Sequence, residues 1–139
     1  MEPLDNAQFQ ALLEFRLALR RFNRWSEAQA RAVGLTHAQH QLLLAIKGHP
    51  GPQSPTIGDV ADYLLLRHHS AVELVNRAQA ASLVTWTRDS VDGRIVRLSL
   101  TDKGEECIER LSQLHLAELR QLAPLLEHLQ PGGHNNTAV

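Results

Sequence analysis

The chain has 139 residues, which is enough for one domain with a hydrophobic core and too few for two ordinary ones. Its 14 Lys and Arg residues nearly balance 15 Asp and Glu residues, which excludes a basic coat for nonspecific nucleic-acid binding. The one cysteine, Cys107, excludes an internal disulfide, and no apolar run approaches the roughly 20 residues of a membrane span, so we expect a cytoplasmic protein without a membrane partner.

The first predicted element is a long helix, capped by Asp5 or Asn6, that continues to about Arg31 before Gly34 ends it. A helix of roughly 25 residues spans about 38 Å, which is long for so small a domain. Its apolar stripe is wide. Part of this helix is therefore expected to lie against a second subunit.

A second helix, "HAQHQLLLAIKG", is expected between a cap at Thr36 and Gly48, and "HPGPQSP" after it holds three prolines and cannot be helical. Thr56 and Asp59 then form a capping-box pattern that opens a short helix. Another helix, "RHHSAVELVNRAQAA", follows within a few residues. Two short helices joined by a tight turn form a helix-turn-helix.

Two strands, "LVTWTRD" and "RIVRLSL", are indicated by β-branched residues and period-two alternation. The turn at 91–93 is expected to use Asp92-Gly93, with Gly93 at positive φ. A last long helix is capped by Thr101, and Pro124 is expected to kink or restart it. Its apolar excess, which includes Leu111 and Leu122, again indicates a second subunit. The end, "PGGHNNTAV", is predicted to be disordered.

This order of elements, and the residues from "GLTHAQHQLLLAI" to "LSLTDKG", resemble the MarR family of transcription regulators over roughly residues 34–104. The most specific piece is Asp89, then Asp92-x-Arg94, then Leu100-Thr101-x-x-Gly104, which follows the family's wing pattern. The segment from Ser70 to Arg77 is similar to the family's recognition helix. Two positions depart from the family: Gly93 replaces a common second arginine, and Ser82 replaces a usual glycine.

The resemblance implies a homodimer on a pseudo-palindromic duplex operator, and the residue chemistry agrees. A helix fits the major groove, about 12 Å wide, and an arginine on a hairpin tip suits the narrow minor groove. Residues 67–97 hold five arginines against three acids, a balance of +2 before any histidine is protonated. The predicted DNA-binding residues are Arg67, His68, His69, Ser70, Glu73, Arg77, Arg88, Asp92, Arg94 and Arg97.

The resemblance also implies a small effector, often aromatic or anionic, bound between the dimerising helices and the DNA-binding lobe. Candidates to line its pocket are Phe22, Trp25, His37 and His40. His37 and His40 are also spaced to begin a metal site, but no Cys or carboxylate lies nearby in sequence, so we predict no metal and no cofactor. Cys107 is interpreted as a structural thiol rather than an oxidant sensor.

The predicted fold is mainly α, a winged helix-turn-helix with a two-stranded β-wing between long dimerisation helices at 1–34 and 101–130. The winged-helix lobe covers 35–100, and the disordered tail covers 131–139. The predicted function is sequence-specific regulation of transcription, most simply repression, under control of a small effector. The alternative is a winged helix that binds proteins and not DNA. No phosphate loop, nucleophile elbow or HExxH motif is present, so we predict that the chain is not an enzyme.

Overall fold

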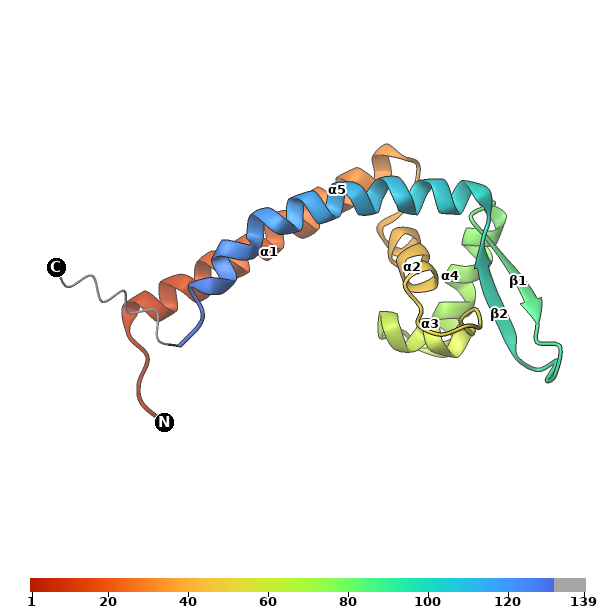
Figure 1. Cartoon of the computed structure of the whole chain (residues 1–139), viewed down its shortest axis with the longest axis horizontal. Coiled ribbons are helices and arrows are strands. Elements are labelled where there is room, and N and C mark those ends of the chain that lie inside the picture. Colours follow the sequence, from red (N-terminus) through yellow and green to blue (C-terminus); the bar gives the residue numbers. More distant parts are fainter. Residues whose placement is uncertain (132–139) are drawn as a thin grey trace.

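The structure, a computed structural model, describes residues 1–131, so all but the first residue of the expected tail lies outside the described residues. Two long helices, α1 (Asn6–Ala32) and α5 (Asp102–Glu127), run side by side as an arm, and a lobe hangs from one end of it (Figure 1). The lobe contains, in chain order, α2 (His37–Lys47), α3 (Ile57–Leu64), α4 (His68–Ala80), β1 (Val84–Arg88) and β2 (Val96–Leu100). The predicted fold class, a mainly helical winged helix, is confirmed.

The helix starts are formed by local side-chain caps, as the sequence predicts. Asp5 and Gln8 form a capping box at the start of α1, and Thr36 with Gln39 does the same for α2. Thr56 and Asp59 cap α3 reciprocally, which confirms that aspartate serves here in place of the usual glutamate or glutamine. These bonds satisfy amide donors that a helix start would otherwise leave without partners.

The two arm helices end differently from each other. Helix α1 stops where Gly34 adopts a φ of 83°, as predicted. Helix α5 continues through Pro124 as one helix to Glu127, so the expected restart does not occur. Pro124 lies close to the helix end, where few residues beyond it depend on an unbroken ladder.

The hydrophobic core lies in the lobe and at the part of the arm above it. Leu42 and Leu43 of α2 are fully buried there, together with Leu98 of β2 and Leu111 of α5. The assignment of Leu111 to a subunit contact is therefore wrong, because this side chain closes the core of its own chain.

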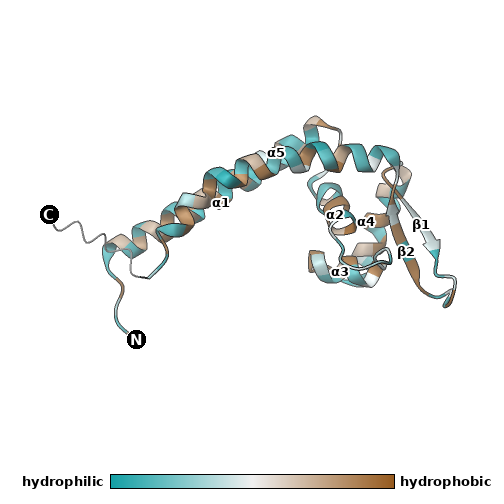
Figure 2. Ribbon diagram, viewed as in Figure 1, coloured by the Kyte–Doolittle hydropathy of each residue, from teal (hydrophilic) through white to brown (hydrophobic). Residues whose placement is uncertain are grey.

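The arm, by contrast, leaves large apolar side chains uncovered in the single chain. Phe9 is 57% exposed and Leu13 is 65% exposed on α1, and Leu119 is 45% exposed on α5. Figure 2 shows residues of high hydropathy along the arm as well as inside the lobe. Exposed apolar side chains in a row are typical of a surface that another protein covers.

The wing is an antiparallel pair in which Trp86 lies opposite Leu98 and Arg88 lies opposite Val96. Residues 89–95 connect the strands, so the link is longer than the expected tight turn. Gly93 does not have a positive φ, and that prediction is wrong. The Asp89 carboxylate instead accepts hydrogen bonds from the amides of Val91 and Asp92 and shapes the loop.

A strained residue joins α4 to β1. Ser82 has a φ of 60°, in the left-handed region that glycine adopts at little cost. The family's usual glycine at this position therefore has a physical reason. Ser82 keeps the same turn in this chain, and its carbonyl accepts a hydrogen bond from the Thr101 hydroxyl at 2.6 Å.

Candidate nucleic-acid interface

Helix α4 presents one polar face to solvent and one apolar face to the core. Ala71, Val75 and Ala78 are buried. The predicted base-reading and phosphate-binding side chains occupy the other face, where Arg67, His68, His69, Glu73 and Arg77 are exposed and Ser70 is half-buried. Arg67, at the N-cap, makes no side-chain capping bond, so the first amides of α4 remain available as donors to a phosphate.

The wing tip holds Arg94 outward. Its side chain is 92% exposed, and its Nε and Nη2 each donate to the Asp92 carboxylate at 3.1 Å. Asp92 also accepts from the backbone amide of Arg94 at 3.1 Å. These bonds lower the pKa of Asp92, which stays ionised at neutral pH. Asp92 therefore braces Arg94 at the wing tip.

The start of α4 and the wing tip meet at one hollow of about 350 Å³. His68 lines it from α4, Arg94 and Ile95 line it from the wing, and Thr56 and Gly58 line it from the start of α3. The helix-turn-helix and the wing thus face the same space. Two elements that contact adjacent grooves of one duplex must be arranged in this way.

Two of the predicted DNA-binding arginines, Arg88 and Arg97, donate hydrogen bonds to other groups of the chain. Arg88 donates to the Gly93 carbonyl at 2.9 Å, and its guanidinium lies 6.0 Å from the centre of the Trp86 ring. Arg97 donates from Nε to Asp89 at 2.7 Å and from Nη1 to the Ser54 carbonyl at 2.8 Å. The Arg97 side chain is only 22% exposed, so its placement differs from that of Arg94.

Two residues that the sequence analysis did not single out as site residues support this surface. Asp89 binds Arg97, and that bond together with the amides of Asp92 and Val91 lowers the pKa of Asp89. Trp86 donates from its indole nitrogen to Gln79 at 2.6 Å, which ties β1 to α4. An aspartate that can accept from the amides two and three residues later is a known sequence signal for a turn, and Asp89 fits it. The Trp86–Gln79 hydrogen bond has no sequence signature.

Three of the four candidate effector residues come together where α1, α2 and α5 meet. Phe22 and Trp25 have ring centres 5.9 Å apart, and Trp25 and His40 both lie against His115, at 4.8 and 4.6 Å. His115 is a further member of this cluster, and no local sequence pattern marks it. The fourth candidate, His37, lies close enough to influence the titration of His40.

The histidine cluster contains both satisfied and unsatisfied ring nitrogens. His115 Nδ1 lies 2.7 Å from the Leu111 carbonyl, to which it must donate, and its Nε2 lies 2.7 Å from the Ser26 hydroxyl. The buried Nδ1 atoms of His37 and His40 have no hydrogen-bond partner within residues 1–131. Burial, reinforced by His115 and His37, lowers the pKa of His40 to about 4.

This cluster predicts a loss of stability in mild acid. His40 stays neutral in the folded chain until about pH 4 but takes up a proton near pH 6.5 when unfolded. Stability is therefore unaffected by His40 above about pH 6.5, and roughly 2 kcal/mol is lost on going down to about pH 4.5. Urea denaturation at both pH values measures the loss. In His40→Leu the loss of unfolding free energy between the two pH values should be smaller by roughly 2 kcal/mol, whereas in His128→Gln it should equal that of the wild type. An equal loss in wild type and His40→Leu contradicts the prediction.

A groove of about 490 Å³ lies between the arm helices. Phe22 and Trp25 line it together with Leu17 and Arg21 of α1 and Leu122 of α5. His37 and His40 do not line this groove, so of the four candidate effector residues Phe22 and Trp25 face it.

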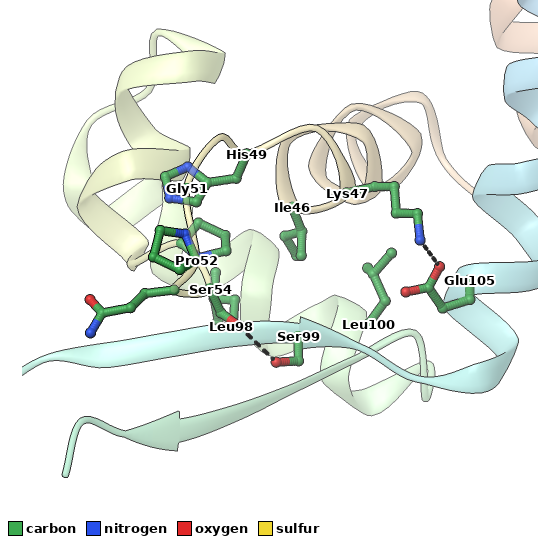
Figure 3. Close-up of a pocket in the computed structure, with 12 residues that line it drawn as sticks. Ile46, Lys47, His49, Gly51, Pro52, Ser54, Leu98, Ser99, Leu100 and Glu105 are labelled. Atoms are coloured by element: carbon green, nitrogen blue, oxygen red, sulfur yellow. Dashed lines mark hydrogen bonds and ion pairs between the residues drawn. The ribbon is translucent and has the colours of Figure 1, made fainter.

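Another pocket, of about 290 Å³, lies between the proline-rich loop before α3, strand β2 and the start of α5 (Figure 3). Lys47 and Glu105 close one end with an ion pair of 2.7 Å. At the other end Ser54 and Ser99 face each other, with hydroxyls 3.5 Å apart. Beside the pocket the proline-rich loop is bonded to the second strand of the wing, where the Leu98 amide donates to the Pro55 carbonyl.

Neither metal-binding clusters nor membrane spans are found in the described part of the chain. Among residues 1–131, no group of three or more His, Cys, Asp or Glu side chains could hold a metal ion, and His37 and His40 lack a third ligand. No helix in that range is long and apolar enough to cross a bilayer. Cys107 is half-buried against the core.

Residues 33–95 match the sequence model of the MarR family. No curated protein gives a significant match to the sequence. The matched segment covers the lobe from the end of α1 to the wing tip, including the helix-turn-helix. The resemblance drawn from the wing and recognition-helix residues is confirmed.

Solved structures with similar folds agree. A MarR family transcription regulator shares 22% identical residues at a TM-score of 0.70, covering 84% of this chain and 75% of its own. AbsC, a MarR family transcriptional regulator from Streptomyces coelicolor, shares 20% identical residues at a TM-score of 0.69. The match covers 93% of this chain and 98% of AbsC. MepR from Staphylococcus aureus, in a complex with DNA, shares 18% identical residues at a TM-score of 0.69. The match covers 81% of each chain. At these identities the likeness shows the fold.

Proposed function

We propose that this chain, which has the fold of the MarR family transcription regulators and matches their sequence model over residues 33–95, binds a pseudo-palindromic duplex operator as a homodimer and represses transcription. The observation that carries the proposal is the shared hollow, where His68 at the start of α4 and Arg94 on the wing face the same space. The complex of S. aureus MepR with DNA supports it by likeness of fold.

The charge distribution supports a duplex partner. The chain has a net charge of −1, yet Arg67 before α4 and Arg88 and Arg94 of the wing are exposed, and Arg94 lines the same hollow as His68. Helix α4 itself contains one acidic residue, Glu73, which is exposed. A local cationic surface on an otherwise neutral protein favours a polyanion held in one orientation over nonspecific adhesion.

The exposed leucines of the arm support dimerisation through α1 and α5. A pair of recognition helices held by such an arm would enter major grooves about one helical turn apart. The groove between α1 and α5 supports control by a small molecule, since Phe22 and Trp25 offer aromatic surface there. Its charged lining is Arg21 together with the carboxylates of Glu14 and Glu118. A ligand there would change the position of the lobe relative to the arm.

Arg94→Ala tests the DNA-binding proposal. On a duplex that the wild-type protein selects from a random-sequence pool, the variant should bind about tenfold or more weakly, because one minor-groove contact per protomer is lost. The dependence of log affinity on log salt should fall by about one or two units per dimer. The preferred bases should not change, because the major-groove contacts come from α4.

Arg120→Ala, an exposed arginine of the arm, is the control and should bind as the wild type does. If Arg94→Ala binds like the wild type with the same salt dependence, the wing is not a DNA contact. If the wild-type protein selects no duplex at all, a winged helix that binds another protein takes the place of the proposed function.

A further inference from the structure

Hydrogen bonds link the proline-rich loop to the tip of the wing without a gap. The Ser54 carbonyl accepts from Arg97 at 2.8 Å, and Arg97 donates to Asp89 at 2.7 Å. The second oxygen of Asp89 accepts from the amide of Asp92 at 3.0 Å, and Asp92 holds Arg94. We call this path from Ser54 through Arg97, Asp89 and Asp92 to Arg94 the wing latch.

The wing latch is anchored to the helix-turn-helix. The proline-rich loop ends at Thr56, the N-cap of α3, which forms an isolated β-bridge with Arg97. The Leu98 amide also donates to the Pro55 carbonyl at 2.8 Å. Figure 3 shows the same loop lying along β2, with Ser54 facing Ser99. The base of the wing is therefore held at a fixed place relative to the DNA-reading helices.

Exposure divides the wing latch into an inner and an outer ion pair. The side chains of Arg97 and Asp89 are 22% and 12% exposed, whereas those of Arg94 and Asp92 are 92% and 36% exposed. A partly buried pair is screened less by solvent and holds its geometry better than an exposed one. Arg97 is thus placed to orient the loop and Arg94 to reach outward.

We propose that Asp89 and Arg97 are positioning residues, which act on DNA binding by holding Arg94 at the angle from which it enters the groove. This role rests on the proposed function, since it needs Arg94 to contact DNA. It replaces the prediction that Arg97 itself binds DNA. The wing would otherwise be a hairpin on a seven-residue loop, whose tip could sample many directions at an entropic cost to binding.

A double-mutant cycle tests the wing latch. Arg97→Gln removes the inner ion pair, and Asp89→Asn weakens it while its amide oxygen can still accept from the loop amides. Each is expected to weaken binding to the selected duplex by about three- to tenfold in the wild-type background. In the Arg94→Ala background each should cause no further loss, because the group that it positions is gone.

Arg77→Gln is the matched control, since Arg77 is exposed on α4 and should bind phosphate directly. The loss of DNA affinity caused by Arg77→Gln should be the same in the wild-type and the Arg94→Ala backgrounds. If Arg97→Gln weakens DNA binding as much in the Arg94→Ala background as in the wild-type background, as expected for Arg77→Gln, Arg97 binds DNA directly. The proposed role of the wing latch is then wrong. Unfolding of both Arg97→Gln and Asp89→Asn, seen by circular dichroism, would also overturn it, because the pair would then support the fold. Failure of Arg94→Ala to weaken binding would instead count against the proposed function.

Discussion

Replacing Gly104 with alanine is expected to destabilise the fold by about 3 kcal/mol, a large part of the stability of a small domain. A Cβ at Gly104 would lie 2.2 Å from the Leu83 carbonyl oxygen and 3.2 Å from its carbon. This oxygen is backbone and also accepts from the Thr101 amide at 3.1 Å, so it cannot move without breaking that hydrogen bond. The glycine of the family's wing pattern is thus needed for close approach of two backbones.

Gly93→Ala is the matched control for this substitution. A Cβ at Gly93 meets nothing within 4 Å, and its φ is not positive, so stability should change by less than about 0.5 kcal/mol. Chemical denaturation followed by circular dichroism measures both variants. Equal stability of Gly104→Ala and wild type would show that the start of α5 does not pack against the Leu83 backbone as described.

Placing a charge on the arm is expected to separate the dimer and to abolish tight operator binding. Leu13→Glu and Leu119→Glu each put a carboxylate where a subunit contact is proposed, and the exposure of both leucines in the single chain means that the fold should survive. Because two linked half-sites bind far more tightly than one, the loss of operator affinity should be about 100-fold or more. Sedimentation velocity at micromolar concentration measures the change in mass.

Gln10→Glu adds the same charge at an exposed position of α1 without removing a leucine, and should leave the mass and the affinity unchanged. A wild-type protein that sediments as a monomer at micromolar concentration would contradict the proposed dimer. Leu111 is unsuitable for this test, since it is fully buried in the core and a charge there should unfold the lobe.

Local signals in the sequence account for most of the fold. The caps at Asp5, Thr36 and Thr56 join residues three apart, so their pattern can be read directly from the chain. The same holds for the brace of Arg94 by Asp92, two residues away. Helix lengths, the order of elements and the exposed face of α4 follow from apolar periodicity.

Contacts between distant segments could not be predicted in this way. Arg97 and Ser54 are 43 residues apart, and Ser26 and His115 are 89 apart, so nothing in their local sequence tells that they meet. The local sequence therefore marks neither the bond from Arg97 to Ser54 nor the place of His115 beside Ser26. The wing tip was misjudged for a related reason: the Asp89 side chain shapes the loop, and Gly93 does not need a positive φ.

The central claim, that the start of α4 and the wing form a surface for duplex DNA, is tested most directly by selection. Genomic duplex fragments retained by the purified wild-type protein would be sequenced, and binding of one retained fragment would be measured at several salt concentrations. The account predicts a shared pseudo-palindromic sequence and an affinity that falls linearly with log salt, as counterions are released from phosphates. Retention of no fragments above background, or of fragments without any common sequence, would contradict it.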